Sequence, residues 1–204
     1  MDDPFHHPTY PLLIVISGPS GVGKDTVIRR MKERGLPCHF VVTATTRAPR
    51  PGEVDGRDYL FYSAEEFARL QASGEFLESA RVYSDLKGIP RQQVRQALSS
   101  GKDVVLRVDV QGARTVRRLC PEALLMFLST DSEEELAQRL RQRHTESPEG
   151  LRVRLTTARG EMGCSGEFDY VVPNRDHRLD ETVDLILSII QAEHARVHHR
   201  RVTL

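Results

Sequence analysis

The stretch 12–34 constrains the fold of this chain more than any other. A short apolar run at 12–17 precedes a glycine-rich segment, GPSGVGKDT, and a helical pattern follows over 24–34. In a GxxxxGK sequence between a strand and a helix, backbone N–H groups surround phosphate oxygens and the lysine reaches the terminal phosphates. The alternative, a glycine-rich turn without a ligand, leaves the spacing, the lysine and the following helix unexplained. The sequence therefore predicts a nucleoside triphosphate site made by Gly18, Pro19, Ser20, Gly21, Val22, Gly23, Lys24, Asp25 and Thr26.

One residue of this loop departs from the usual motif. Asp25 follows Lys24, where the motif has a serine or threonine whose hydroxyl contacts Mg²⁺. Asp25 is therefore a candidate ligand for Mg²⁺, directly or through water. Two alternatives stay open: Thr26 is a weaker substitute, and Asp25 only stabilises the helix dipole.

Strand and helix patterns alternate along the rest of the chain. Strands are predicted at 40–42, 104–108, 123–128 and 170–172, and helices at 91–100, 111–119, 132–143, 148–162 and 179–197. Ser63 and Glu66 form a capping box that opens another helix, to about residue 72. Such alternation predicts an α/β fold in which helices cover both faces of a parallel sheet. The core segments are then 1–42, 91–130 and 163–204, and the insertions 43–90 and 131–162 are expected over the ligand-binding edge.

Composition excludes several classes of protein. The chain has 204 residues, and its 29 Lys and Arg balance 29 Asp and Glu, so a broad basic surface for nucleic acid is not expected. No apolar run approaches the ~20 residues of a membrane span, and the acidic N-terminal stretch has no signal-peptide core. Three widely spaced cysteines favour a reducing compartment. We therefore expect a cytoplasmic protein that binds small molecules; the sequence leaves its oligomeric state open.

The first insertion contains a compact basic segment. Arg47 and Arg50 lie among prolines and glycines, and Tyr59 follows. Prolines restrict the backbone and so help to preorganise the two arginines, whose guanidinium groups suit bidentate recognition of phosphate. A solvated basic loop is an equally good interpretation of this pattern alone.

Several motifs together resemble the guanylate kinase family. They are SGPSGVGK at 17–24, TTRAPRPGEVDGRDY at 45–59, GEFLE at 74–78, VDVQG at 108–112 and RLRQRHTE at 139–146. The resemblance extends over about 12–174, in the order found in that family. It implies a P-loop nucleoside monophosphate kinase fold, with a core, a GMP-binding insertion at 43–90 and a helical lid at 131–162. It also implies Mg²⁺-dependent transfer of the γ-phosphoryl group of ATP to GMP or dGMP, giving ADP and GDP in purine nucleotide metabolism.

The resemblance assigns roles residue by residue. Arg47, Arg50 and Tyr59 would hold the GMP phosphate, and Thr43 stands where the family usually has a guanine-binding Ser. Glu78 would accept from guanine N1–H and the exocyclic amine, both donors, whereas adenine presents an acceptor at N1. Asp109 would lie near the guanine and the reacting phosphates.

Lid arginines complete the implied site. Arg139 and Arg143 are four residues apart and so share a helix face, and Arg154 follows on the next helix. Surface pairing with nearby glutamates is the alternative. The resemblance favours catalysis, because phosphoryl transfer needs charge neutralisation and alignment. Lys24, Arg47, Arg139, Arg143 and Arg154 are the implied catalytic residues, Arg139 and Arg143 also bind ATP, and Asn174 contacts its adenosine.

The chain departs from the family at four positions. Lys87 stands at a phosphate-binding Tyr, where an ammonium can donate to the same phosphate, and Ile89 replaces a hydroxyl that helps to hold guanine. Arg107 replaces a common acidic residue two positions before Asp109, and His144 replaces a usual Gly. The resemblance thus supports the phosphate chemistry more firmly than the base specificity.

Two other functions are considered. One is a related small-molecule kinase, such as a ribose 1,5-bisphosphate kinase, some of which resemble the GKD loop; Glu78 and the Arg47–Arg50 segment favour GMP instead. The other is a non-catalytic guanylate kinase-like module that binds proteins. Such modules typically erode the phosphate loop, whereas Gly18, Gly23 and Lys24 remain here.

Overall fold

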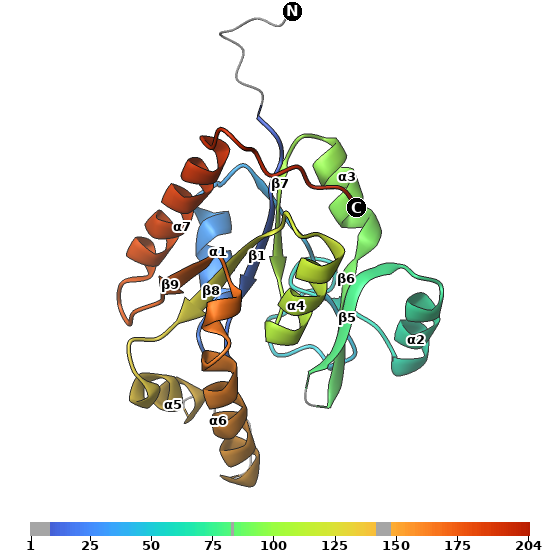
Figure 1. The fold of residues 1–204 in the computed structure, drawn as a ribbon. Coiled ribbons are helices and arrows are strands. Elements are labelled where there is room, and N and C mark those ends of the chain that lie inside the picture. The colour runs from blue at the N-terminus through green and yellow to red at the C-terminus, as the bar shows by residue number, and fades with distance from the viewer. Residues whose placement is uncertain (1–8, 83, 142–147) are drawn as a thin grey trace, which may run out of the picture.

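A parallel sheet forms the centre of the molecule. The computed structural model describes residues 9–82, 84–141 and 148–204 (Figure 1). Within them, a five-stranded sheet has the order β2-β7-β1-β8-β9, and all neighbouring strands are parallel. Its strands are β1 (Leu13–Ser17), β2 (Cys38–Phe40), β7 (Asp103–Arg107), β8 (Leu124–Ser129) and β9 (Tyr170–Pro173). The predicted α/β fold with a parallel sheet is confirmed.

Helices cover both faces of this sheet. α1 (Lys24–Glu33) and α7 (Leu179–His194) lie on one face, and α3 (Arg91–Ser99) and α4 (Val110–Leu119) on the other (Figure 1). Because alternate side chains of a strand point to opposite faces, Ile14 and Ile16 of β1 join the first core cluster, and Leu13 and Val15 join the second. All four are fully buried, and each such side chain contributes ~1.5–3 kcal/mol through burial. The apolar strand thus anchors the glycine-rich loop that follows it.

The first insertion folds around a second sheet, with the order β4-β3-β6-β5. The elements here are β3 (Ala44–Thr45), β4 (Leu60–Phe61), α2 (Ala64–Ala72), β5 (Phe76–Val82) and β6 (Asp85–Pro90). Phe67 and Phe76 stack with ring centroids 4.5 Å apart and pack with Ala44 into a small separate core. The Ser63 hydroxyl accepts from the Glu66 N–H at the start of α2, which confirms the predicted N-cap.

Two further helices project beyond the carboxyl ends of the central strands (Figure 1). They are α5 (Glu133–Arg141) and α6 (Pro148–Met162), and a short 3-10 turn, η1 (Ser165–Glu167), leads back to β9. Leu136 and Leu140 of α5 pack against Ala158 of α6 in a cluster of their own. The two helices therefore pack against each other through apolar side chains.

One strand begins two residues earlier in the chain than predicted. The apolar run at 40–42 predicted β2 there, whereas β2 comprises Cys38–Phe40. Cys38 is in register with Asp103 of β7, and at Val42 the backbone N–H already donates to the Gln93 side chain, 3.1 Å away. The last helix is also shorter than predicted, since α7 ends at His194. The position of β2 is determined by its pairing with β7. The apolar pattern of one segment carries no information about that pairing.

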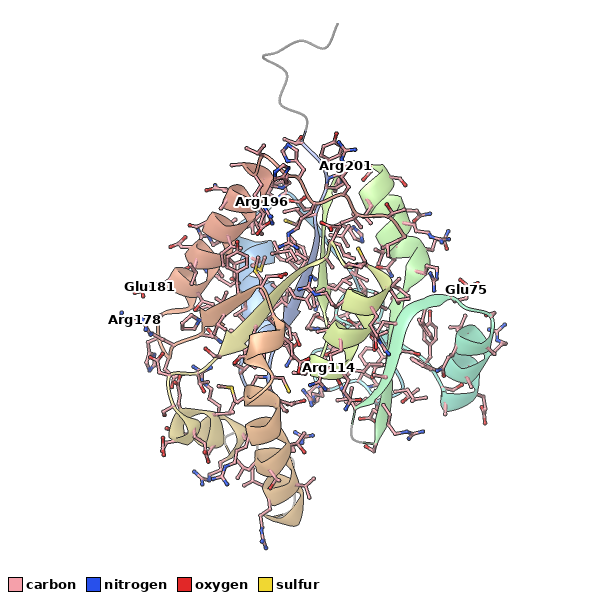
Figure 2. The ribbon with its side chains drawn as sticks, viewed as in Figure 1. Glu75, Arg114, Arg178, Glu181, Arg196 and Arg201 are labelled. Atoms are coloured by element: carbon pink, nitrogen blue, oxygen red, sulfur yellow. The ribbon has the colours of Figure 1, made fainter. Side chains whose placement is uncertain are left out.

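The two ends of the described chain meet far from α5 and α6. Arg201 lies over the Tyr10 ring at 4.9 Å, and Figure 2 shows Arg196 and Arg201 at this end of the molecule. Val202 and Leu204 pack against the second core cluster. Cys38, Cys120 and Cys164 are free thiols. Among the described residues, no helix is long and apolar enough to cross a membrane.

Candidate active site

A cavity lies where the carboxyl ends of β1 and β7 face the second sheet. Ligands of open parallel sheets bind at this edge. The cavity gathers predicted residues from the loop, the first insertion, β7–α4 and α6, as well as five that were not nominated. The predicted residues that line it are Ser20, Gly21, Gly23, Lys24, Asp25, Thr43, Arg47, Arg50, Tyr59, Lys87, Asp109 and Arg154, and the five additional ones are Val82, Asp85, Arg107, Val108 and Glu161.

The glycine-rich loop has the backbone that its sequence predicts. Gly18 has φ +137° and Gly23 has φ +98°, values that glycine adopts readily. A Cβ on Gly18 would lie 2.4 Å from the Leu128 carbonyl oxygen, and one on Gly23 would lie 2.4 Å from Asn174 Nδ2. The loop is therefore closely packed as well as sharply turned, and neither position accepts a side chain.

Lys24 points into the loop. Its Nζ donates to the carbonyl oxygens of Gly18 and Pro19, at 2.6 and 3.0 Å. Burial lowers the Lys24 pKa to about 8, although the nearby Glu161 carboxylate opposes this shift. An anion bound in the loop would restore the full charge of the lysine, because a close negative charge favours the ammonium form.

Glu161 of α6 reaches the same loop. Its Oε2 accepts from the Ser20 backbone N–H at 3.1 Å. Burial raises the Glu161 pKa, and the Ser20 N–H and Lys24 oppose that shift. A carboxylate thus lies against a loop N–H of the kind that binds phosphate oxygens. Sequence reasoning missed this residue, because Glu161 is one of several charged residues in a helix without a motif.

Arg139 and Asn174 hold the backbone of the phosphate loop in place. Arg139 Nη1 and Asn174 Nδ2 donate to the Val22 carbonyl oxygen at 3.0 and 2.7 Å. Arg139 also pairs with Glu135 and Asp176. Arg139 and Asn174, which were both predicted to bind ATP, therefore contact the loop that was predicted to bind the ATP phosphates. Arg154 lines the cavity, and Arg143 lies outside the described residues.

Asp25 and Arg107 form an ion pair across the cavity. Arg107 Nη1 donates to Asp25 Oδ1 at 2.5 Å, and the Arg107 guanidinium lies 4.4 Å from the centre of the Tyr59 ring. Asp25 in the loop and Arg107 at the end of β7 both replace the residue that is usual at their position, and the structure brings the two into contact. The sequence carried no signal for this contact beyond the unusual residue at each position, since 82 residues separate them.

The basic segment of the first insertion is held in shape by Glu53. Arg47 Nη2 pairs with Glu53 Oε1 at 2.9 Å, and the Arg50 backbone N–H donates to Glu53 Oε2 at 2.7 Å. Arg47 lies over the Tyr59 ring at 5.2 Å. Burial lowers the pKa of Lys87, and Arg107 lowers it further. Together these groups form a basic lining, which suits an anionic ligand.

Beside this lining, two buried polar groups have no partner. Glu78 Oε1 and Thr43 Oγ1 make no hydrogen bond within the described residues, although Glu78 is 5% exposed and Thr43 is 3% exposed. Burial, and secondarily the Asp109 carboxylate, raises the Glu78 pKa to about 7. Asp109 Oδ1 caps α4 by accepting from the Gly112 N–H, and Ile89 is fully buried in the second core cluster. Unsatisfied buried acceptors are costly, so these two favour a ligand that carries donors.

The donor set fits magnesium only together with phosphates. Among the described residues, no group of three or more His, Cys, Asp or Glu side chains is arranged to hold a metal ion. Mg²⁺ usually keeps several waters and is bound through one or two carboxylates and substrate phosphates. Asp25 and Asp109 line the cavity and provide such carboxylates. The residues present therefore suit an ion that arrives with a nucleotide.

Comparison with known proteins places the chain in a family. The sequence model of the guanylate kinase family matches residues 10–193. "Guanylate kinase 2, chloroplastic/mitochondrial" of Oryza sativa subsp. japonica is 51% identical over 203 residues, which cover 99% of this chain and 71% of the relative. A guanylate kinase of Nocardia farcinica is 51% identical over 164 residues, covering 79% of this chain and 85% of the relative.

A solved structure agrees with this assignment. The crystal structure of guanylate kinase from Anaplasma phagocytophilum superposes with a TM-score of 0.77 at 30% identity, and covers 93% of this chain and 89% of that one. Its P-loop nucleoside monophosphate kinase fold is thus the fold of this chain. The family match, the relatives and the shared fold agree with the phosphate loop: this chain belongs to the guanylate kinase family of nucleotide-binding phosphotransferases.

Proposed function

We propose that the protein transfers the γ-phosphoryl group of ATP to GMP or dGMP, giving ADP and GDP in purine nucleotide metabolism. The attacking group is an oxygen of the acceptor phosphate, and ADP leaves as the P–O bond to its β-phosphate breaks. Little covalent chemistry is required of the protein, so its work is alignment and charge neutralisation.

The Glu78 carboxylate, whose Oε1 has no partner among the described residues, carries this proposal. Guanine presents two adjacent donors, the N1–H and the exocyclic amine, which an ionised carboxylate can accept as a pair. Thr43 provides a second unpartnered oxygen. Arg47, Arg50, Tyr59 and Lys87 then bind the phosphate of the same nucleotide, and Asp109 lies between the base and the reacting groups.

ATP occupies the loop from Gly18 to Thr26, as the packing around Lys24 suggests. Backbone N–H groups of the loop and Lys24 bind the terminal phosphates, while Arg139, Arg143 and Asn174 complete the ATP site. Negative charge that develops on the transferred phosphoryl group is neutralised by Arg47 of the first insertion and by the lid arginines Arg139, Arg143 and Arg154. Water is excluded when the lid arginines approach, because closure replaces solvent around the γ-phosphoryl group by fixed donors.

Asp25 would hold Mg²⁺ directly or through water, with a carboxylate that also accepts from Arg107. When bound with ATP, the ion would offset negative charge on the phosphates. We also propose the division into core segments 1–42, 91–130 and 163–204, a GMP-binding insertion at 43–90 and a lid at 131–162.

A coupled assay of ADP release tests the proposal. ATP and Mg²⁺ are supplied with GMP, dGMP, AMP, UMP or ribose 1,5-bisphosphate in turn. We expect turnover with GMP and dGMP and at most traces with the others. Failure of GMP to support turnover would reject the proposal, and turnover with ribose 1,5-bisphosphate alone would favour the related sugar-phosphate kinase. The intact loop and its buried lysine support an enzyme rather than a protein-binding module.

A further inference from the structure

Arg107 lies at the junction of the two nucleotide sites. It is the last residue of β7 and is in register with Ile16 of β1, directly before the phosphate loop. Its side chain is 16% exposed and lines the cavity. A mostly buried guanidinium at this edge is costly unless it is paired and hydrogen-bonded.

Contacts from two parts of the molecule hold the guanidinium in place. Nη1 donates to Asp25 of α1 at 2.5 Å, and Nη2 approaches the Asp58 carbonyl oxygen at 3.4 Å. The Tyr59 ring lies 4.4 Å from the guanidinium carbon. A guanidinium has five N–H donors, and these contacts use two of them among the described residues. Arg107 is thus oriented, yet it retains donors for an anion.

Tyr59 connects Arg107 to the basic lining. Arg47 contacts the same ring at 5.2 Å, so two guanidinium groups flank one tyrosine. The positive charge of Arg107 also acts on Lys87, whose pKa it lowers after burial has done so. Cations that repel one another within one cavity are stabilised together by a dianion such as a phosphate monoester.

We infer that Arg107 is a further substrate-binding residue, which donates to the phosphate of the acceptor nucleotide while Asp25 keeps its guanidinium oriented. The inference rests on the proposed function for the identity of that nucleotide. It adds a guanidinium from the end of β7 to the phosphate ligands that the first insertion provides.

Paired titrations with GMP and guanosine test this role, because guanosine has the base but lacks the phosphate. Isothermal titration calorimetry is performed without ATP on the wild-type protein and on Arg107→Met and Arg107→Lys, with displacement titrations for weak binding. In Arg107→Met we expect GMP affinity to fall at least tenfold, about 1.4 kcal/mol, and guanosine affinity to stay within twofold. Arg107→Lys keeps the charge but not the fork of donors, so its GMP affinity should lie between the other two.

Arg30→Met is the matched control, since Arg30 also pairs α1 with another element, through Asp180 at 2.7 Å. It should leave both affinities unchanged.

Two results would overturn the inference and leave the proposed function intact. One is an equal loss of GMP and guanosine affinity, and the other is a GMP affinity within twofold of wild type in Arg107→Met. If Arg107→Met does not fold, the same comparison with Arg107→Lys decides, with an expected loss of at least threefold for GMP alone. A wild-type protein that binds no GMP would reject the proposed function itself, and this inference with it.

Discussion

Charge at single buried residues decides how this site recognises its ligands. Glu78 is buried and its Oε1 has no partner among the described residues, and burial raises its pKa to about 7. Near neutral pH the empty site thus holds a mixture of the acid and the carboxylate. In the proposed function only the carboxylate can accept both guanine donors, so base recognition would be linked to proton release.

The first prediction follows from this linkage. As pH rises from 6 to 8, Glu78 ionises, and the KM for GMP should fall severalfold and then level off. Glu78→Gln removes the titrating group, so its KM for GMP should be at least tenfold higher and should lack this pH dependence. Steady-state kinetics at saturating ATP measure both effects. An unchanged KM for GMP in Glu78→Gln would remove Glu78 from guanine recognition.

Lys24 is the second residue whose charge matters. We expect Lys24→Ala to lose at least a hundredfold in kcat, because the group that reaches the terminal phosphates is missing. The fold should survive, since the lysine contacts only carbonyl groups of its own loop in the described contacts. Circular dichroism and thermal unfolding provide the structural check, and a variant with wild-type turnover would contradict the role.

At the scale of elements, α6 and the phosphate loop are joined through one carboxylate. Glu161 accepts from Ser20 N–H where a phosphate oxygen would bind in the proposed ATP site. The helix pair α5–α6 packs around its own small cluster, and Arg139 of α5 also donates to the Val22 carbonyl oxygen of the loop. If ATP binds as proposed, it must displace this carboxylate before the Ser20 N–H can bind a phosphate.

A third prediction tests this competition. In Glu161→Gln the side chain near Lys24 is neutral and a weaker acceptor, so ATP should bind about threefold to tenfold more tightly. Glu134→Gln, at an exposed position of α5, is the control and should bind ATP as the wild type does. Titration calorimetry with ATP and Mg²⁺ measures the affinities. Weaker ATP binding in Glu161→Gln would show that the carboxylate assists the nucleotide rather than competing with it.

Sequence patterns predicted elements better than contacts between them. The β1–loop–α1 unit and the Ser63 cap follow from local rules, since each depends on residues a few positions apart. β3 and β4 have two residues each and depend on pairing with neighbouring strands, and β5 and β6 are likewise defined by their antiparallel pairing with each other. The Glu161–Ser20 contact joins residues 141 apart, and no local rule relates them.

For the whole molecule, a polar cluster fastens the last helix to the chain end. Burial raises the pKa of Glu193, but hydrogen bonds from Arg200, Tyr170 and Arg196 outweigh it and hold the pKa at about 2. Glu193 is 3% exposed, and Arg200 Nε lies 2.7 Å from its Oε2. By contrast, Arg178 and Glu181 near the start of α7 form an ion pair at the molecular surface (Figure 2), where such pairs contribute little.

The fourth prediction concerns stability against pH. Because the native pKa of Glu193 lies below its ordinary value of 4.5, the unfolded state binds more protons between pH 4.5 and 2. The contribution of this carboxylate is therefore complete above pH 4.5 and is lost as pH falls towards 2. Glu193→Gln should be less stable than wild type at pH 6, and the difference should shrink at pH 2.5. Denaturant unfolding measures this, with Glu181→Gln as the surface control; a constant difference across that range would contradict the prediction.

The contact between Glu161 and the phosphate loop also bears on inhibitor design. A compound that fills only the GMP side leaves this contact in place and so binds the enzyme in the arrangement described here. An ATP analogue must first break it, and its measured affinity is the net result of that exchange. A GMP-side inhibitor and an ATP analogue with equally favourable contacts would therefore differ in affinity. A compound that joins both nucleotides would bind most tightly when its bridging phosphate takes the place of the Glu161 carboxylate at the loop.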